Sequence, residues 1–232
     1  MTTIAIAMER IEERIQQACS RSGRERSEVR LMGVSKFQAL PKVEEAWNVG
    51  LRLFGENRVQ EAAEKFRGVK ARLPEIELHL IGSLQRNKAK AAVSLFDAID
   101  SVDRETLIDE LGALTNSRET ALPVLLELHT AEDSKTGFPT LDSLYHAAEK
   151  VYAYPGLALS GLMTVAPFTS DERLIRAAFR ALSGARDKLA ARFPDYAWSC
   201  LSMGMSNDFE IAIEEGATLI RIGTALFGER HT

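Results

Sequence analysis

The sequence predicts a single (β/α)₈ barrel, and three observations lead to this fold class. Eight short apolar segments recur along the 232 residues, and stretches with helical spacing separate them. No run of Pro, Gly, Ser or like charge divides the chain as a linker would. Barrels of this kind commonly fold as one unit at this length, so we expect one domain over residues 1–232.

The eight apolar segments are the predicted strands. They span residues 29–35, 51–57, 76–83, 97–103, 124–130, 157–165, 198–203 and 218–228. Strands that are apolar on both faces are typical of parallel pairing through helical crossovers, and eight such units close naturally into a barrel. An open doubly wound sheet explains the alternation almost as well, but we favour the barrel.

Seven helices are predicted between the strands, and one before them. The seven span residues 43–50, 57–68, 85–96, 104–117, 140–151, 170–193 and 206–216. An amphipathic helix over residues 3–22 precedes the first strand. The chain therefore reads as a barrel with an extra helix at its N-terminus.

Composition excludes several classes of function. The net charge is −4 and the basic residues are scattered, which argues against nucleic-acid binding. The N-terminus lacks a basic leader, and no apolar run approaches the roughly 18 residues of a membrane span. Cys19 and Cys200 are far apart and outside metal-ligand spacing, so they read as free thiols. A cytoplasmic protein fits these features best.

Polar residues gather where the predicted strands end. In barrels of this kind the carboxyl ends of the strands carry the functional site. The residues there are Ser35, Lys36, Glu56, Asn57, Ser83, Asp103, Thr130, Thr164, Ser202, Ser206, Arg221, Gly223 and Thr224. The opposite strand ends show nothing comparable, so we expect the site at the carboxyl ends.

Lys36 directly follows the first predicted strand. Strand alternation places it on one face with Val34 and Met32, so if those fill the barrel interior the amine lies at its mouth. An amine kept from water can form an imine with an aldehyde. An isolated lysine is more often a solvated residue that begins a loop, so the neighbouring loops must decide.

Two neighbouring loops suit a phosphate group. Residues 202–208 place small and hydroxyl residues before a helix that begins near Asp208, and Gly223 and Thr224 end the eighth strand. Phosphate sites of barrels often form from the loops after the seventh and eighth strands. Ordinary turn chemistry is the alternative reading, and we favour phosphate binding over it.

Arg221 and His79 are candidate interior residues. Arg221 shares a face with Gly223 and needs a partner, either an ion pair with Asp103 or Glu56 or an acceptor on a ligand ring. His79 is read as a packing residue, and no metal site is predicted, because no carboxylate stands at ligand spacing. Met163, Met203 and Met205 could pack on a flat ring, although core filling alone would explain them.

Seven ordered segments resemble a known family over essentially the whole chain. They are LMGVSK, FGENRVQEA, HLIGSLQRNK, SVDR, GLMTVAP, LSMGMSNDFEIAIEEG and IRIGTALFG. They resemble the pyridoxal phosphate homeostasis proteins, the YggS/PROSC family. The resemblance implies a barrel similar to the N-terminal domain of alanine racemase that holds pyridoxal 5′-phosphate as an internal aldimine on Lys36.

The resemblance also implies roles for other residues. The phosphate would be received by Ser206, Gly223 and Thr224, the ring would lie near Asn57 and Met163, and Arg221 would face the pyridine nitrogen. Arginine keeps its proton, so that nitrogen stays an unprotonated acceptor and the ring is a weak electron sink. Racemases of this fold draw a second acid/base group from a further C-terminal domain, and this chain ends at Thr232, so no catalytic residue is expected.

The implied function is vitamin B6 homeostasis, with storage of the cofactor and its delivery to dependent apo-enzymes by a monomer or weak dimer. The alternatives are a low-efficiency amino-acid racemase and a Schiff-base aldolase acting on a sugar phosphate. The chain departs from the family pattern at His129 and Thr130, and at Asp100, where the family often carries an aromatic residue or histidine. Lys135, in a polar rim segment over residues 132–137, is a conceivable second amine, although a solvated lysine is more typical.

Overall fold

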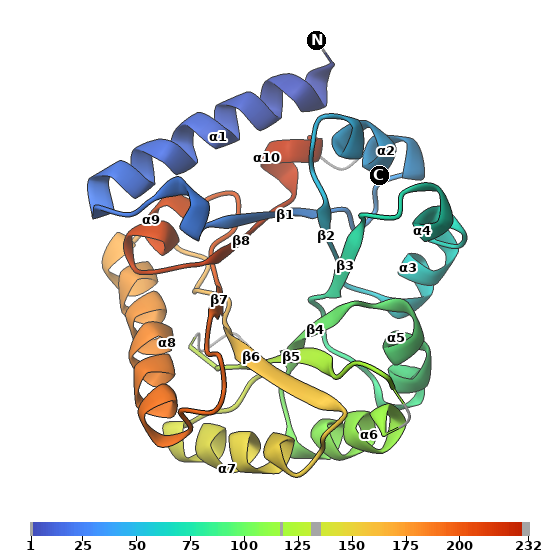
Figure 1. Cartoon of the computed structure of the whole chain (residues 1–232). Coiled ribbons are helices and arrows are strands. Elements are labelled where there is room, and N and C mark those ends of the chain that lie inside the picture. Colours follow the sequence, from blue (N-terminus) through green and yellow to red (C-terminus); the bar gives the residue numbers. More distant parts are fainter. Residues whose placement is uncertain (1, 117, 131–135, 229–232) are drawn as a thin grey trace.

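The computed structural model, which describes residues 2–116, 118–130 and 136–228, is a closed barrel of eight parallel strands (Figure 1). The strands follow one another around the barrel in chain order, and the eighth pairs with the first. The predicted barrel is thus confirmed, and the open sheet that was the alternative is wrong. Helices form the outer ring.

The observed strands lie at the predicted places. They are β1 (Arg30–Val34), β2 (Leu53–Glu56), β3 (Glu77–Leu80), β4 (Ala98–Val102), β5 (Leu122–Glu127), β6 (Leu157–Met163), β7 (Cys200–Ser202) and β8 (Leu219–Ile222). The prediction of strand through residue 228 was wrong. Gly223 turns the chain into a short helix, in which the N–H groups of Leu226 and Phe227 donate to the Gly223 carbonyl oxygen. A short apolar run does not distinguish strand from helix.

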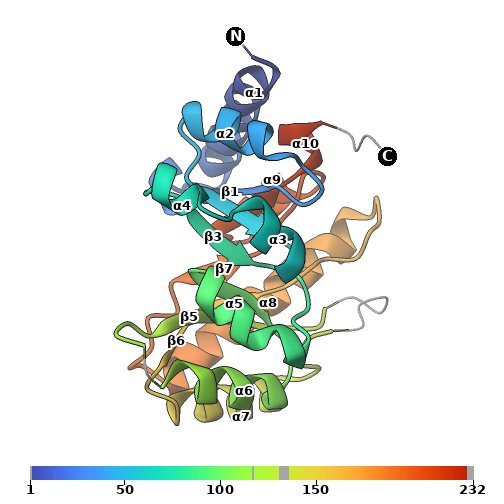
Figure 2. The same cartoon turned by 90° about the vertical axis from the view of Figure 1, so that its right-hand side faces the viewer.

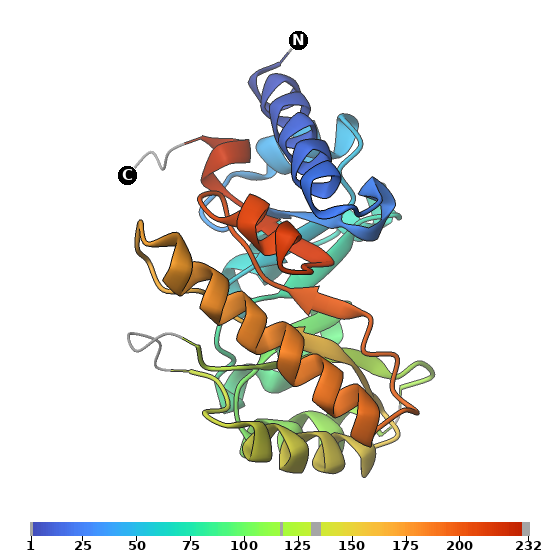
Figure 3. The same cartoon turned by 90° about the vertical axis from the view of Figure 1, so that its left-hand side faces the viewer.

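The helices cover the barrel. They are α1 (Thr3–Ser22), α2 (Leu40–Asn48), α3 (Val59–Lys65), α4 (Val69–Arg72), α5 (Ala89–Leu95), α6 (Glu105–Thr115), α7 (Leu141–Tyr152), α8 (Glu172–Arg192), α9 (Phe209–Glu214) and α10 (Thr224–Phe227). The bounds of α1 are those predicted. It starts at the Thr2 side-chain cap, stops at left-handed Gly23, and packs against α2, α9 and α10 (Figure 3).

Strand alternation divides the apolar residues into two cores. The outer faces of the strands, such as Ile220 and Ile222 of β8, pack with the helices in one large core. Met32, Leu53 and Leu219 form a separate small cluster inside the barrel. Met32 and Val34 are both buried, as the argument for Lys36 required. Residues that alternate with the outer core therefore lie in the interior.

The barrel interior also holds charged side chains. His79, Asp100, Glu127 and Arg221 each alternate with outer-core residues, and each is less than 9% exposed. Buried charges are costly unless they are paired, so their partners are part of the site.

Figure 2 shows the loop before α8 and the end of α10 on the same side of the barrel, beyond the carboxyl ends of the strands. Within the described residues, no helix has the length and apolar content to span a bilayer.

Candidate functional site

Lys36 lies at the carboxyl end of β1, between β8 and β2. It is half-buried, and it shares the interior face with Met32 and Val34. Val34 lies beside Gly223, which follows β8, since a Cβ atom added to that glycine would contact Val34 Cβ at 3.5 Å. Lys36 and Gly223 therefore follow the ends of two adjacent strands at the mouth of the barrel.

The chain turns sharply directly after Lys36. The N–H of Gln38 donates to the Ser35 carbonyl oxygen at 3.0 Å, and Phe37 takes a left-handed conformation with φ of 62°. Such a conformation costs a non-glycine residue about 1–2 kcal/mol. The N–H of Phe37 donates to Glu61 Oε1 of α3, which holds the turn. Strained backbone of this kind concentrates at functional sites.

A buried ion pair supports this turn from outside the barrel. Lys65 Nζ donates to Glu56 Oε1 at 2.8 Å and to the Ser35 carbonyl oxygen at 2.6 Å, and Ser35 Oγ donates to the same carboxylate. Burial raises the pKa of Glu56, whereas its bonds from Lys65 and Ser35 act in the opposite direction. Sequence analysis missed this network, although the i,i+4 spacing of Glu61 and Lys65 was a signal for it.

Arg221 does not form either ion pair that sequence analysis considered. Its guanidinium donates to Ser202 Oγ at 2.9 Å and to the Thr164 carbonyl oxygen at 2.8 Å. Glu56 projects outward with Phe54 and cannot meet an interior arginine, and Asp103 pairs with Arg104 at the rim. Both predicted partners were wrong, because strand alternation and a nearer cation place them elsewhere.

The two predicted phosphate loops are joined. Ser206 Oγ, in the loop after β7, accepts a hydrogen bond from the N–H of Ala225 at 3.3 Å. Gly204 has φ of 91°, and a Cβ atom there would collide with Ala212 and Phe209, so this tight turn requires glycine. Ser206 and Gly223 are half-buried and Thr224 is exposed. Ser206, Gly223 and Thr224 therefore lie together at the mouth.

An acidic residue beside these loops was not singled out. Asp208, which precedes α9, is 8% exposed and accepts a hydrogen bond from the N–H of Met205. Burial raises the pKa of this carboxyl. The Asp208 side chain thus holds the turn that carries Ser206 and keeps its own charge bound to the backbone.

Asn57 and Met163 both lie at the carboxyl ends of strands. Asn57 follows β2, and its Oδ1 is buried with no hydrogen-bond partner among the described residues. Gly82 packs against the Asn57 backbone, where a larger residue would collide. Met163 ends β6 and is 2% exposed. The structure therefore places all seven predicted residues on or after five consecutive strands, in the order β6, β7, β8, β1 and β2.

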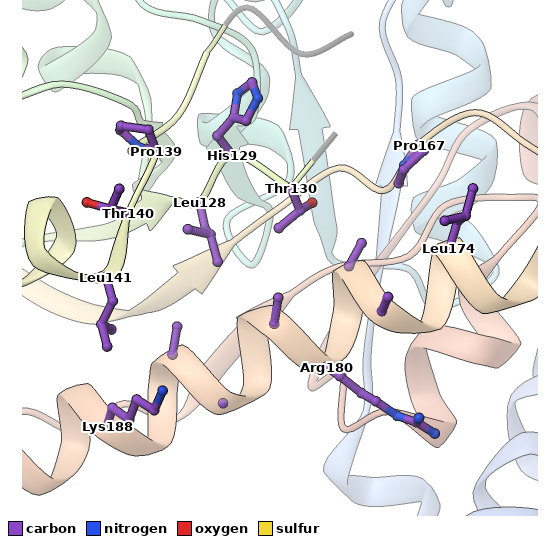
Figure 4. Close-up of a pocket in the computed structure, with 15 residues that line it drawn as sticks. Leu128, His129, Thr130, Pro139, Thr140, Leu141, Pro167, Leu174, Arg180 and Lys188 are labelled. Carbon is purple, nitrogen blue, oxygen red and sulfur yellow. The ribbon is translucent and has the colours of Figure 1, made fainter. Parts of the chain in front are cut away.

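A groove of about 850 Å³ lies outside the barrel, between α8 and the segments that flank residues 131–135 (Figure 4). His129 and Thr130 line it, together with small residues of α8. Thr130 Oγ1 lies 2.7 Å from Thr164 Oγ1, which connects the rim to the residue whose carbonyl holds Arg221. None of the seven predicted residues lines this groove. Lys135 lies outside the described residues.

The opposite mouth of the barrel is also polar, contrary to the sequence-based expectation. A cavity of about 560 Å³ there is lined by residues that include Glu77, His79, Asp100 and Cys200. Burial raises the pKa of the Cys200 thiol to about 12, so this thiol stays protonated. Both cysteines are free, as predicted. Among the described residues, no group of three His, Cys, Asp or Glu side chains is arranged to hold a metal ion.

The buried His79 lies between the carboxylates of Glu77 and Asp100, which favour its charged form. Burial alone would lower its pKa, but the charge of Asp100 and the hydrogen bond to Glu77 raise it to about 9. The same contact with His79 lowers the pKa of Glu77 to about 2. His79 is buried and has a hydrogen-bond partner, as the packing interpretation expected, but sequence analysis did not foresee its contacts with two carboxylates.

We expect this charge to make stability depend on pH. The folded pKa of His79 exceeds its ordinary value of 6.5, so its stabilising contribution is complete below about pH 6.5 and is lost as pH rises through about 9. The loss is at most about 3 kcal/mol. Urea unfolding between pH 6 and pH 10 should show it. His79→Gln should flatten the profile and exposed His146→Gln should not, whereas equal slopes in all three proteins would contradict the assignment.

Comparison with known proteins places the chain in a family. The family model described as "Alanine racemase, N-terminal domain" matches residues 6–231. A pyridoxal phosphate homeostasis protein of Aquifex aeolicus is 40% identical over 96% of each chain. The protein of the same name from Escherichia coli is 36% identical over 99% of this chain and 98% of its own. The chain belongs to the pyridoxal phosphate homeostasis protein family.

Solved structures agree with this family membership. The structure of PipY from Synechococcus elongatus with PLP bound is 36% identical, has a TM-score of 0.82, and covers 94% of this chain and 100% of its own. An alanine racemase of Clostridium difficile shares the fold at 11% identity, with a TM-score of 0.69. That match covers 95% of this chain and 56% of the racemase.

The residues present fit the cofactor that the family name implies. Lys36 supplies an amine, and the joined loops after β7 and β8 supply small and hydroxyl residues. Arg221 supplies N–H donors from the barrel interior. The unpartnered buried Oδ1 of Asn57 is an acceptor that a ligand group can satisfy. The mouth of the barrel therefore offers the groups that a phosphorylated aromatic aldehyde needs.

Proposed function

We propose that this protein binds pyridoxal 5′-phosphate through Lys36, and that it stores and delivers the cofactor without catalytic turnover. The observation that carries the proposal is the position of Lys36 directly after β1, two residues beyond Val34, which lies beside Gly223 and the linked loops of Ser206 and Thr224. Lys36 Nζ would add to the aldehyde carbon with loss of water. The relatives that share the family name support this reading.

The phosphate would be held by the two linked loops. Ser206 and Thr224 offer hydroxyl groups, and Gly223 allows the backbone to approach closely. Asp208 remains engaged with the backbone N–H of Met205, which limits its repulsion of a phosphate. Holding the phosphate at this place fixes the aldehyde end of the cofactor near Lys36.

We expect Thr224→Val to weaken binding of pyridoxal phosphate by about tenfold, because it removes a hydrogen bond to a charged group. The exposed Thr106→Val on α6 is the matched control and should leave affinity unchanged. Titration followed by absorbance measures both. Equal affinities of the two variants would remove Thr224 from the phosphate site.

The cofactor ring would lie between Asn57 and Met163, above Arg221. Bound pyridoxal phosphate supplies an electron sink for amino-acid chemistry. Arg221 is already fixed by Ser202 and the Thr164 carbonyl group, and its permanent charge keeps the pyridine nitrogen an unprotonated acceptor. An arginine in this position weakens the electron sink, which favours holding the cofactor over using it.

This proposal includes the cellular setting expected from the sequence. The protein would act in the cytoplasm as a monomer or weak dimer, and pyridoxal phosphate-dependent apo-enzymes would receive the cofactor from it. It would bind neither nucleic acid nor membranes. The net charge of −4 and the scattered basic residues support the first of these two expectations.

The proposal is tested by adding pyridoxal phosphate to the purified protein. The expected result is a yellow absorbance band whose intensity corresponds to one bound cofactor per chain. A protein that stays colourless would contradict the proposal. Incubation with single enantiomers of several amino acids then tests for turnover. Sustained racemisation above the rate with free cofactor, scored by chiral chromatography, would favour the racemase alternative.

A further inference from the structure

Asp100 has no role in the proposed contacts with the cofactor, yet it is completely buried inside the barrel. Its neighbour Ile99 packs in the outer core, so strand alternation turns Asp100 inward. Neither carboxylate oxygen has a hydrogen-bond partner among the described residues. A buried carboxylate of this kind is costly unless nearby cations compensate it.

His79 is the nearer of two such cations. Its Nδ1 lies 3.0 Å from Asp100 Oδ1, which is an ion-pair distance, although the two groups are not aligned as a hydrogen bond. Its Nε2 lies 2.8 Å from Glu77 Oε1, and Glu77 also pairs with Arg30 at the amino end of β1. Positive and negative side chains therefore alternate from the mouth at the amino ends of the strands inward to Asp100.

Arg221 is the second cation. It is 4% exposed, and its guanidinium donates to neutral oxygens of Ser202 and Thr164. Burial lowers the pKa of Arg221. The negative charges of Asp100, Asp208 and Glu127 act in the opposite direction, and that of Asp100 has the largest effect of the three.

The other two acids already serve other groups. Asp208 accepts from the N–H of Met205, and Glu127 accepts from Thr136 Oγ1 at 2.7 Å. Asp208 lies in the loop after β7, and Glu127 is the last residue of β5. Asp100 also shares the interior with Arg221, and among the described residues neither of its carboxylate oxygens accepts a hydrogen bond.

We propose that the ion pair of Asp100 and His79, which shares the barrel interior with Arg221, sets the charge beneath the ring of bound pyridoxal phosphate. The inference rests on the proposed function, because it concerns the same site. Asp100 acts through its charge and not through contact with the cofactor, so it is a positioning residue.

Removing either charge should change the protonation of the bound cofactor, and the two changes have opposite signs. Asp100→Asn makes the interior more positive and disfavours the protonated form of the chromophore. His79→Gln makes it more negative and favours that form. A unit charge roughly 10 Å away shifts a pKa by about one unit at an effective dielectric constant of about 20.

The experiment is an absorbance measurement at pH 7 on protein saturated with pyridoxal phosphate. The ratio of protonated to unprotonated chromophore should fall about tenfold in Asp100→Asn and rise about tenfold in His79→Gln. The double variant loses one charge of each sign and should return close to the wild-type ratio. Asp97→Asn removes an acid near the start of the same strand, where it pairs with Lys70, and should leave the ratio unchanged.

Each result decides the inference. An unchanged ratio in Asp100→Asn, or shifts of the same sign in both single variants, would overturn it. If Asp100→Asn does not fold, His79→Gln and the double variant carry the test, and the absence of a rise in His79→Gln is then the contradicting result. A wild-type protein that forms no absorbance band would instead overturn the proposed function.

Discussion

Lys36→Ala should lose the yellow band completely and bind pyridoxal phosphate at least about a hundredfold more weakly, a loss of about 2.7 kcal/mol. The variant removes the amine that would bond to the aldehyde carbon. The phosphate loops around Ser206, Gly223 and Thr224 stay in place, so residual non-covalent binding is expected. Absorbance measures the band, and equilibrium dialysis measures the affinity.

Lys188→Ala is the matched control for this variant. Lys188 is an exposed lysine of α8 that lines the groove outside the barrel (Figure 4), which none of the seven predicted cofactor-binding residues lines. Its removal changes the net charge by the same amount and should leave band and affinity as in the wild type. A Lys36→Ala protein that keeps the band would place the covalent bond on another lysine.

Lys65→Met should destabilise the protein by about 3–5 kcal/mol. Lys65 Nζ compensates Glu56, whose side chain is fully buried, and also binds the Ser35 carbonyl oxygen. Without the ammonium group an uncompensated carboxylate remains in the outer core beneath the turn of Lys36. Urea unfolding at pH 7 measures the change in the free energy of unfolding.

The double variant Glu56→Gln/Lys65→Met separates charge from packing. It removes both charges and should recover most of the lost stability, because a neutral pair costs less to bury than a single charge. The structural assignment would be contradicted by a Lys65→Met protein within about 1 kcal/mol of the wild type. It would also be contradicted by a double variant no more stable than Lys65→Met alone.

The fold was predictable from the sequence because the barrel is a repetitive structure. Eight apolar segments alternate with helical spacing, and the parallel pairing of neighbours follows from that alternation. The exception is residues 223–228, where Gly223 ends β8 and an apolar run continues as a short helix. Local apolar pattern does not determine secondary structure over so few residues.

The site was predictable in its location but not in its pairings. Polar residues at strand ends indicated the mouth of the barrel, and the loops of Ser206 and Gly223 do meet there. The partners of Arg221 were missed, since a guanidinium can reach many acceptors and only the fold selects Ser202 and the Thr164 carbonyl group.

Strand alternation held information that the sequence analysis did not use. It places Glu56 outside the barrel with Phe54, and His79 and Asp100 inside it. The ion pairs of Glu56 with Lys65 and of His79 with Asp100 follow from those placements together with the register of neighbouring strands. The polar cavity at the opposite mouth was also missed, although its lining includes charged residues at the amino ends of the strands, such as Arg30, Glu77 and Asp97.

The most direct measurement is to reduce the complex with borohydride, digest it with trypsin and map the modified lysine by mass spectrometry. The account predicts one modified peptide that spans residues 31–42, because cleavage is blocked at Lys36 and resumes at Lys42. Modification of Lys135 or any other lysine in place of Lys36, or no modified peptide at all, would contradict it.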